Sequence, residues 1–223
     1  MRVANNVEML EVEAEGMVFN PVLVWDDKDT VLIDCTLPGK LDVLKEAISA
    51  CGKRLDDVGT LILTHQDLDH VGCAREIREL GVRVMAHSIE APYIQGDTTP
   101  VRLADMEANK EQSKYAEGTR KTIEACFVKV DRPLEDGEVL DIAGGIRVIH
   151  TPGHMPGHIS LHLLAEDIVV TADASISVEG KLAGPDVRFT KQENMAEANA
   201  SLEKLRAVKP KSYICFHGGQ AAE

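Results

Sequence analysis

The sequence lacks both a long hydrophobic run and a secretory signal. Although 44% of its 223 residues are hydrophobic, no stretch approaches the roughly 18 consecutive apolar residues that a membrane-spanning helix requires. Residues 1–15, MRVANNVEMLEVEAE, interrupt their apolar side chains with glutamates and contain neither a basic region nor a continuous apolar one. We therefore expect no membrane partner and a cytoplasmic location.

Positive charge is also scarce. The chain has 24 Lys and Arg against 37 Asp and Glu, which gives a formal net charge of −13. Nucleic-acid binding depends largely on cationic side chains that displace counterions from the phosphates. The charge balance therefore argues against a nucleic-acid partner and against polyanionic substrates.

Paired cysteines are absent as well. The five cysteines are odd in number and widely spaced, with no CxxC pair: Cys35, Cys51, Cys73, Cys126 and Cys215. This pattern fits neither a disulfide scaffold nor a structural zinc site. We expect reduced thiols, most of them small core residues.

Strand-like segments alternate with helix-like ones in the first part of the chain, and strands dominate the second part. Apolar runs and turn signals predict strands over residues 18–25, 30–34, 60–63, 82–86, 127–130, 138–142, 145–150, 159–164, 167–173 and 212–216. Apolar residues at helical spacing predict helices over residues 40–52, 70–80 and 195–208. The length favours a single domain over residues 1–223.

One segment does not follow this pattern. From about residue 93 to 125 the sequence is charged and helical, which we interpret as an insertion over the main body. The sequence leaves two roles open for it, a lid over a site or the interface of a homodimer.

Potential metal ligands are concentrated at the ends of the predicted strands. In 64-THQDLDHVG-72, which follows the apolar run TLIL, four such residues occupy six positions: His65, Asp67, Asp69 and His70. Three more follow later strands: His154, Asp173 and His217. Strand ends can hold residues from distant parts of the chain at one edge of a sheet. Imidazole and carboxylate groups suit a catalytic zinc, iron or manganese ion.

Taken in order, these motifs resemble the metallo-β-lactamase superfamily over nearly the whole chain. The matching motifs are LID at 32–34, THQDLDH at 64–70, TPGH at 151–154, TAD at 171–173 and HGG at 217–219. The resemblance implies a mixed α/β fold, a four-layer αββα sandwich of two mixed β-sheets flanked by helices. It also implies a site for two divalent metal ions, zinc in the first place.

The resemblance assigns the ligands residue by residue. His65, Asp67 and His154 would hold one ion, and Asp69, His70 and His217 the other, with Asp173 and a water or hydroxide between the ions. Asp34 resembles an aspartate that supports ligand histidines, although a plain turn aspartate is an equal alternative.

Asp67 departs from the family pattern. The usual motif is HxHxDH, and this sequence has HxDxDH. A third ligating carboxylate would cancel the net positive charge of the usual core, and a harder ligand shifts the preference from zinc towards iron or manganese. The other reading is that Asp67 turns away and leaves one site weak.

The resemblance implies a hydrolase. A hydroxide held by two metal ions would attack a small ester, lactone or thioester, and Asp69 would pass a proton to the leaving group. Arg102, Lys181 and Arg188 are candidate substrate contacts. Two alternatives stay open: an iron-dependent oxidoreductase, of the diiron or persulfide-dioxygenase kind, and a metal-binding protein without turnover.

Overall fold

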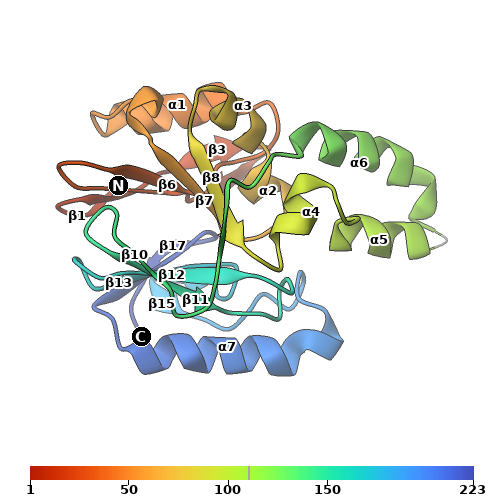
Figure 1. Cartoon of the computed structure of the whole chain (residues 1–223). Coiled ribbons are helices and arrows are strands. Elements are labelled where there is room, and N and C mark those ends of the chain that lie inside the picture. Colours follow the sequence, from red (N-terminus) through yellow and green to blue (C-terminus); the bar gives the residue numbers. More distant parts are fainter. Residues whose placement is uncertain (110) are drawn as a thin grey trace.

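The protein has four layers, with two sheets packed face to face between helices (Figure 1). The computed structural model describes residues 1–109 and 111–223; Lys110, inside the predicted insertion, lies outside the described residues. Within these ranges no helix is long and apolar enough to span a membrane.

The first sheet combines an antiparallel part with a parallel part. Its seven strands lie in the order β1 (Arg2–Ala4), β2 (Val7–Met9), β5 (Val22–Trp25), β6 (Thr30–Ile33), β7 (Thr60–Leu63), β8 (Arg83–His87) and β9 (Arg132–Leu134). Strands β5 and β6 form an antiparallel hairpin, and β6, β7, β8 and β9 run parallel to one another. The carboxyl ends of β6, β7 and β8 therefore lie at one edge of the sheet.

The second sheet is also mixed. Its strands lie in the order β10 (Val139–Leu140), β11 (Ile146–His150), β12 (Ile159–Leu163), β13 (Ile168–Ala172), β16 (Ser212–Cys215) and β17 (Gly219–Ala221). Only β13 and β16 pair in parallel. Two small hairpins lie outside the sheets, β3 (Val12–Ala14) with β4 (Met17–Phe19) and β14 (Ser177–Val178) with β15 (Lys181–Leu182).

Helices cover the outer face of each sheet and complete the predicted αββα sandwich. On the first sheet lie α1 (Leu41–Ala50) and α3 (Ala74–Glu79), and α7 (Met195–Val208) lies on the second sheet (Figure 1). Leu44 and Ile48 of α1 are fully buried in the outer core of the first sheet, and Leu202 and Leu205 of α7 pack in the outer core of the second. A third apolar core fills the space between the sheets.

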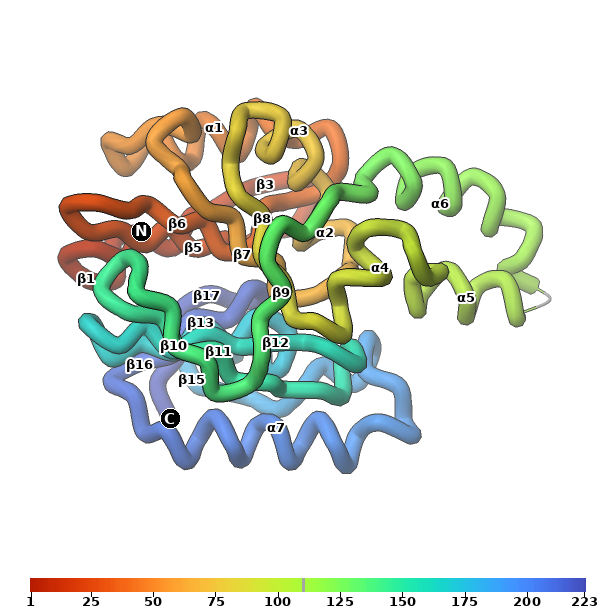
Figure 2. The backbone as a smooth tube through the Cα atoms, viewed as in Figure 1, coloured from red at the N-terminus to blue at the C-terminus, as the bar shows by residue number. Residues whose placement is uncertain are grey.

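A group of three helices projects from one side of the sandwich (Figure 2). They are α4 (Ala91–Gln95), α5 (Val101–Ala108) and α6 (Ser113–Cys126), and α5 and α6 pack on each other. Two other short helices belong to the main body, α2 (Leu68–Val71) and the 3₁₀ turn Leu55–Asp57, and a second 3₁₀ turn, Gln192–Asn194, precedes α7. The predicted insertion corresponds to α4–α6.

Two predicted strands were wrong in detail. Residues 127–130 are not a strand: the Val128 amide donates to the Ile94 carbonyl and the Val130 amide to the Gln95 side chain, so this segment packs against α4. The expected strand over residues 18–25 is two strands, β4 and β5. It breaks at Pro21, which has no amide proton to donate to a neighbouring strand.

Candidate metal centre

Six of the seven predicted ligands lie where parallel strands end. The 64–70 segment follows β7, beside the end of β6, and Asp173 and His217 follow β13 and β16 in the second sheet. His154 lies in the turn between β11 and β12. The two sheets thus bring residues more than 150 positions apart in the sequence to one edge of the sandwich.

The ligand atoms of these residues form overlapping clusters. Within each cluster the atoms lie within 4.8 Å of one another, and the clusters are His65, Asp67 and His154; Asp69, His70 and His217; and His65, His70 and Asp173. In the first cluster, His154 Nε2 lies 3.1 Å from Asp67 Oδ2. In the second, His217 Nε2 lies 3.4 Å from Asp69 Oδ2. We call these two the Asp67 cluster and the Asp69 cluster.

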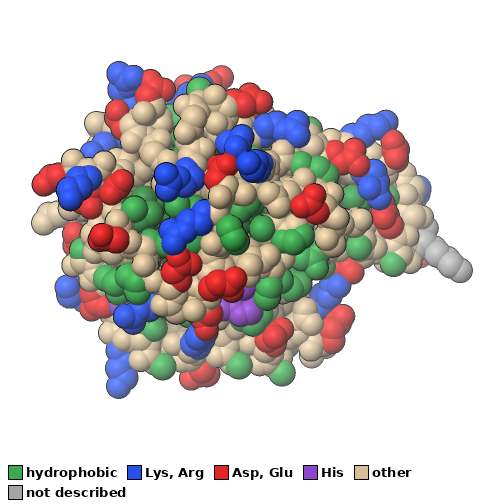
Figure 3. All heavy atoms as spheres, viewed as in Figure 1, with side chains coloured by type: hydrophobic (Ala, Val, Ile, Leu, Met, Phe, Trp, Pro, Cys, Tyr) green, Lys and Arg blue, Asp and Glu red, His purple; other side chains and the backbone are tan. Residues whose placement is uncertain are grey.

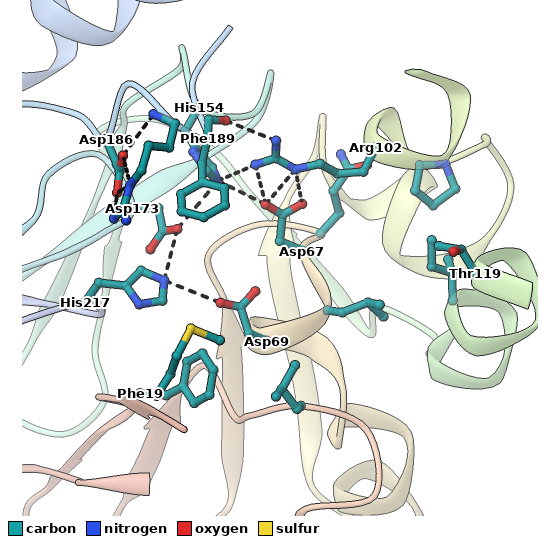
Figure 4. Close-up of a pocket in the computed structure, with 17 residues that line it drawn as sticks. Phe19, Asp67, Asp69, Arg102, Thr119, His154, Asp173, Asp186, Phe189 and His217 are labelled. Carbon is teal, nitrogen blue, oxygen red and sulfur yellow. Dashed lines mark hydrogen bonds and ion pairs between the residues drawn. The ribbon is translucent and has the colours of Figure 1, made fainter. Parts of the chain in front are cut away.

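Asp173 lies between the Asp67 and Asp69 clusters. Its Oδ1 is 3.4 Å from His70 Nε2. Its Oδ2 is 3.6 Å from both His154 Nε2 and His217 Nε2 (Figure 4). One carboxylate therefore faces histidines of both clusters. A carboxylate in this position would help to hold a divalent metal ion in either cluster.

Three buried ligand atoms make no hydrogen bond to any described residue: His65 Nε2, His70 Nε2 and Asp173 Oδ1. Buried polar atoms in folded proteins are nearly always hydrogen-bonded, because leaving one unpaired costs about 1–3 kcal/mol. All three belong to one cluster and have the chemistry of metal ligands. The residues present therefore fit divalent metal ions.

The electrostatics of the site point the same way. Burial disfavours the charged form of His70, but nearby Asp34, Asp173 and Asp69 outweigh it and raise the pKa well above its ordinary value. For His217, burial is likewise outweighed, by hydrogen bonds to Asp173 and Asp69, and the pKa rises to about 9. Both shifts reflect an excess of buried negative charge, which a bound cation would neutralise.

Asp34 connects the two strand ends and orients His70. Its Oδ1 accepts a hydrogen bond from the Thr64 amide (2.8 Å), and its Oδ2 accepts one from the Thr64 hydroxyl (2.7 Å) and lies 2.8 Å from His70 Nδ1. Asp34 is a residue other than glycine with a positive φ of 58°, a conformation that costs about 1–3 kcal/mol and needs such support. Of the two readings of Asp34, the geometry favours the supporting aspartate.

Sequence reasoning missed other supports of the site. His158 accepts a hydrogen bond from the Asp173 amide at Nε2 (3.2 Å) and pairs through Nδ1 with the Thr151 hydroxyl (2.9 Å). Glu90 is fully buried, and its carboxylate accepts from the Gln66 side chain and the Gly157 amide. The glycine-flanked loop 151–158 hinted at His158, but no spacing rule connects Glu90 with residue 66.

Arg102 takes a place that the sequence did not indicate. A candidate substrate contact, it lines the cleft and pairs with Asp67: its Nη2 lies 2.8 Å from Asp67 Oδ2, and its Nε lies 3.1 Å from both carboxylate oxygens (Figure 4). Burial would raise the pKa of Asp67, but the hydrogen bond with His154 and the attraction of nearby His65 outweigh it and hold the pKa well below its usual value. Asp67 is therefore an anion that faces both histidines of its cluster.

A cleft of about 500 Å³ opens onto both clusters. Its apolar wall is formed by Met17, Phe19, Leu37, Leu68, Ile123 and Phe189. Arg188 also lines the cleft, where its guanidinium pairs with Asp186, whereas Lys181 lies in the β14–β15 hairpin and is not among the lining residues. The cleft can take a small molecule with an apolar part against the two ligand clusters.

A family model described as the metallo-beta-lactamase superfamily matches residues 19–217. The chain belongs to this superfamily. A probable metallo-hydrolase, YflN of Bacillus subtilis (strain 168), is 32% identical over 96% of this chain and 84% of that protein. Hydroxyacylglutathione hydrolase GloC of Haemophilus influenzae is 28% identical over 75% of this chain and 71% of that protein.

Solved structures agree with this superfamily assignment. The metallo-beta-lactamase family protein TTHA1429 from Thermus thermophilus superposes with a TM-score of 0.75 at 24% identity, covering 99% of this chain and 76% of that one. This likeness concerns the fold and confirms the predicted αββα sandwich. With the named relatives, membership of the superfamily makes the chain a metallo-hydrolase.

Proposed function

We propose that the protein hydrolyses a small ester, lactone or thioester with two divalent metal ions, one in each cluster, zinc being the first candidate. The observation that carries this proposal is the set of unpaired buried ligand atoms, His65 Nε2, His70 Nε2 and Asp173 Oδ1, beside an apolar cleft. The relatives named as hydrolases, including one acting on hydroxyacylglutathione, support acyl hydrolysis.

Bound divalent ions would supply Lewis acidity, which polarises an acyl oxygen and acidifies water. The protein's own groups do the remaining work. Asp69 lines the cleft within 3.4 Å of His217 Nε2, where it can accept a proton and pass it to a leaving group. Asp34 fixes the orientation of His70, and the apolar wall that includes Phe19 and Phe189 offers a surface for the hydrocarbon part of a substrate.

The surroundings of the cleft favour a small acyl substrate over a polyanion. Two arginines line it, Arg102 and Arg188, and each is paired with an aspartate that also lines it. On the face shown in Figure 3, basic side chains are scattered among acidic ones and form no broad patch. The apolar wall suits the hydrocarbon part of an acyl chain or a lactone ring.

The test is metal-dependent turnover. Protein stripped with a chelator is loaded with zinc, manganese or iron(II), the last without oxygen, and assayed on esters, lactones and thioesters with the same acyl chain. We expect metal-dependent hydrolysis that His217→Ala removes and the matched control His162→Gln retains, because His162 pairs with Asp167 outside the cleft. Metal retention without turnover of any class would refute the hydrolase and leave a metal-binding protein.

Asp67 favours the second candidate, an iron-dependent oxidoreductase, because a carboxylate in place of an imidazole suits iron better than zinc. The same preparations discriminate between the two functions. Oxygen consumption by the iron form with a persulfide substrate, without hydrolysis of any acyl substrate, would support the oxidoreductase.

A further inference from the structure

Arg102 brings a fixed positive charge into the Asp67 cluster. Its Nη2 lies 2.8 Å from Asp67 Oδ2 and 3.3 Å from His154 Nε2. These are the two atoms that a metal ion in this cluster would need. The guanidinium therefore contacts two of the three candidate ligands of the cluster.

This placement is supported from several sides. The Arg102 Nη1 donates to the Phe189 carbonyl at 3.0 Å, on the far side of the cleft. The Val101 amide, at the start of α5, donates to the Gln66 side chain at 2.7 Å, and Gln66 in turn donates to buried Glu90 at 2.9 Å. Gln66 stands between His65 and Asp67 in the sequence, so the ligand segment itself holds the residue that precedes Arg102.

A second interaction, an ion pair, connects α5 to the same side of the cleft. Asp105, one helical turn after Arg102, pairs with Lys191 at 2.6 Å. The helix is therefore fastened to the 189–191 segment at two points, and Arg102 is not a freely moving surface side chain, although 38% of it is exposed. A bidentate guanidinium–carboxylate pair of this kind is stronger than an ordinary surface ion pair.

The Asp69 cluster has no permanent cation of this kind. Among the described residues the ion-pair partners of Asp69 and Asp173 are histidines alone. A metal ion entering the Asp67 cluster meets the repulsion of a nearby guanidinium and competes with it for Asp67 and His154. In the Asp69 cluster the cationic side chains are His70 and His217, and an imidazolium can give up its proton to an entering metal ion, whereas a guanidinium cannot.

We propose that Arg102 makes the Asp67 cluster a low-affinity subsite, so that the first metal ion binds in the Asp69 cluster and a second enters only when it displaces or outcompetes the guanidinium. The inference rests on the metal centre of the proposed function. Its test measures metal binding and not turnover, so the inference and the proposed function can be refuted independently of each other.

The experiment is a titration of chelator-stripped protein with zinc against a chromophoric competitor. Wild-type protein is expected to bind two ions with separate affinities. Arg102→Met keeps the length of the side chain and removes its charge, and should strengthen the second affinity at least about tenfold, or about 1.4 kcal/mol, with the first unchanged. Arg188→Met is the matched control, because Arg188 lines the same cleft but pairs with Asp186, and it should change neither affinity.

Two further variants show which of the two zinc affinities belongs to the Asp69 cluster and which to the Asp67 cluster. His217→Ala should remove the tight ion and His154→Ala the weak one. Equal affinities in the wild type, or an unchanged or weakened second ion in Arg102→Met, would overturn the inference while the two-metal hydrolase stands. Binding of no ion would overturn both. Thermal unfolding followed by circular dichroism confirms that each variant is folded.

Discussion

The hydrogen bonds of Asp34 make a sharp prediction for Asp34→Asn. One oxygen, Oδ2, accepts from the Thr64 hydroxyl and faces His70 Nδ1, and the other, Oδ1, accepts from the Thr64 amide. Asparagine has one oxygen and one amino group in nearly the same shape, so the substitution changes the hydrogen-bond pattern and leaves the volume alone.

Neither orientation of that amide satisfies all partners. With the amino group towards Thr64 N, two donors face each other in a buried place. With the amino group towards His70 Nδ1, the ring must shift its proton to Nε2, the atom that faces Asp69 and Asp173 and that a metal ion would need. The Asp34 carboxylate therefore sets which nitrogen of His70 is free to bind metal.

The magnitudes follow from the structure. Loss of such a supporting partner typically weakens metal binding about 10- to 100-fold. One unpaired buried donor costs about 1–3 kcal/mol of stability. Zinc competition measures the first effect, and urea unfolding of the chelator-stripped protein measures the second. Asp42→Asn is the matched control, because 94% of its side chain is exposed. Zinc affinity of Asp34→Asn indistinguishable from wild type would refute this account of His70.

Three further predictions concern stability and metal preference. Burial raises the pKa of Glu90 from 4.5 to about 7, so the neutral carboxyl adds its full share to the free energy of unfolding below pH 4.5, and this share is lost as the pH rises towards 7. Between these pH values the free energy of unfolding of the chelator-stripped wild type, measured in urea, should fall by roughly 3 kcal/mol relative to that of Glu90→Gln. Free energies of the two proteins that change with pH in parallel would contradict this prediction. In Gly72→Ala the new Cβ would lie 2.4 Å from the backbone oxygen of Thr36, and the substitution should lower the free energy of unfolding by about 2–3 kcal/mol or more. Gly118 has open space around it in a helix, so Gly118→Ala should raise the free energy of unfolding by up to about 1 kcal/mol. Equal denaturation midpoints of the two variants would disprove this contrast. Asp67→His should raise the ratio of zinc to iron retained from a mixed-metal medium, measured by plasma mass spectrometry, because imidazole is the softer ligand, and an unchanged ratio would count against Asp67 as a ligand.

Much of the fold and the candidate site could be predicted because the signals are local. Apolar runs marked β6, β7, β12 and β13, and polar residues directly after strands marked the positions that meet at the sheet edge. The predictions that were wrong concerned positions whose structure depends on contacts between distant segments. Residues 127–130 read as a strand because they are apolar, yet their partners are in α4.

The pairing of Arg102 with Asp67 shows the same limit within the site. The two residues are 35 positions apart, and the sequence between them gives no spacing that a motif could record. Only the packing of α5 against the 64–70 segment, through Gln66, brings the guanidinium to the carboxylate. Sequence reasoning identified Asp67 as unusual but had no means of finding the cation beside it.

The most direct test of the two-metal site is anomalous X-ray diffraction at the zinc edge from crystals saturated with zinc. The account predicts two anomalous peaks, one among His65, Asp67 and His154 and one among Asp69, His70 and His217, with Asp173 between them. A single peak, or none among these side chains, would contradict it.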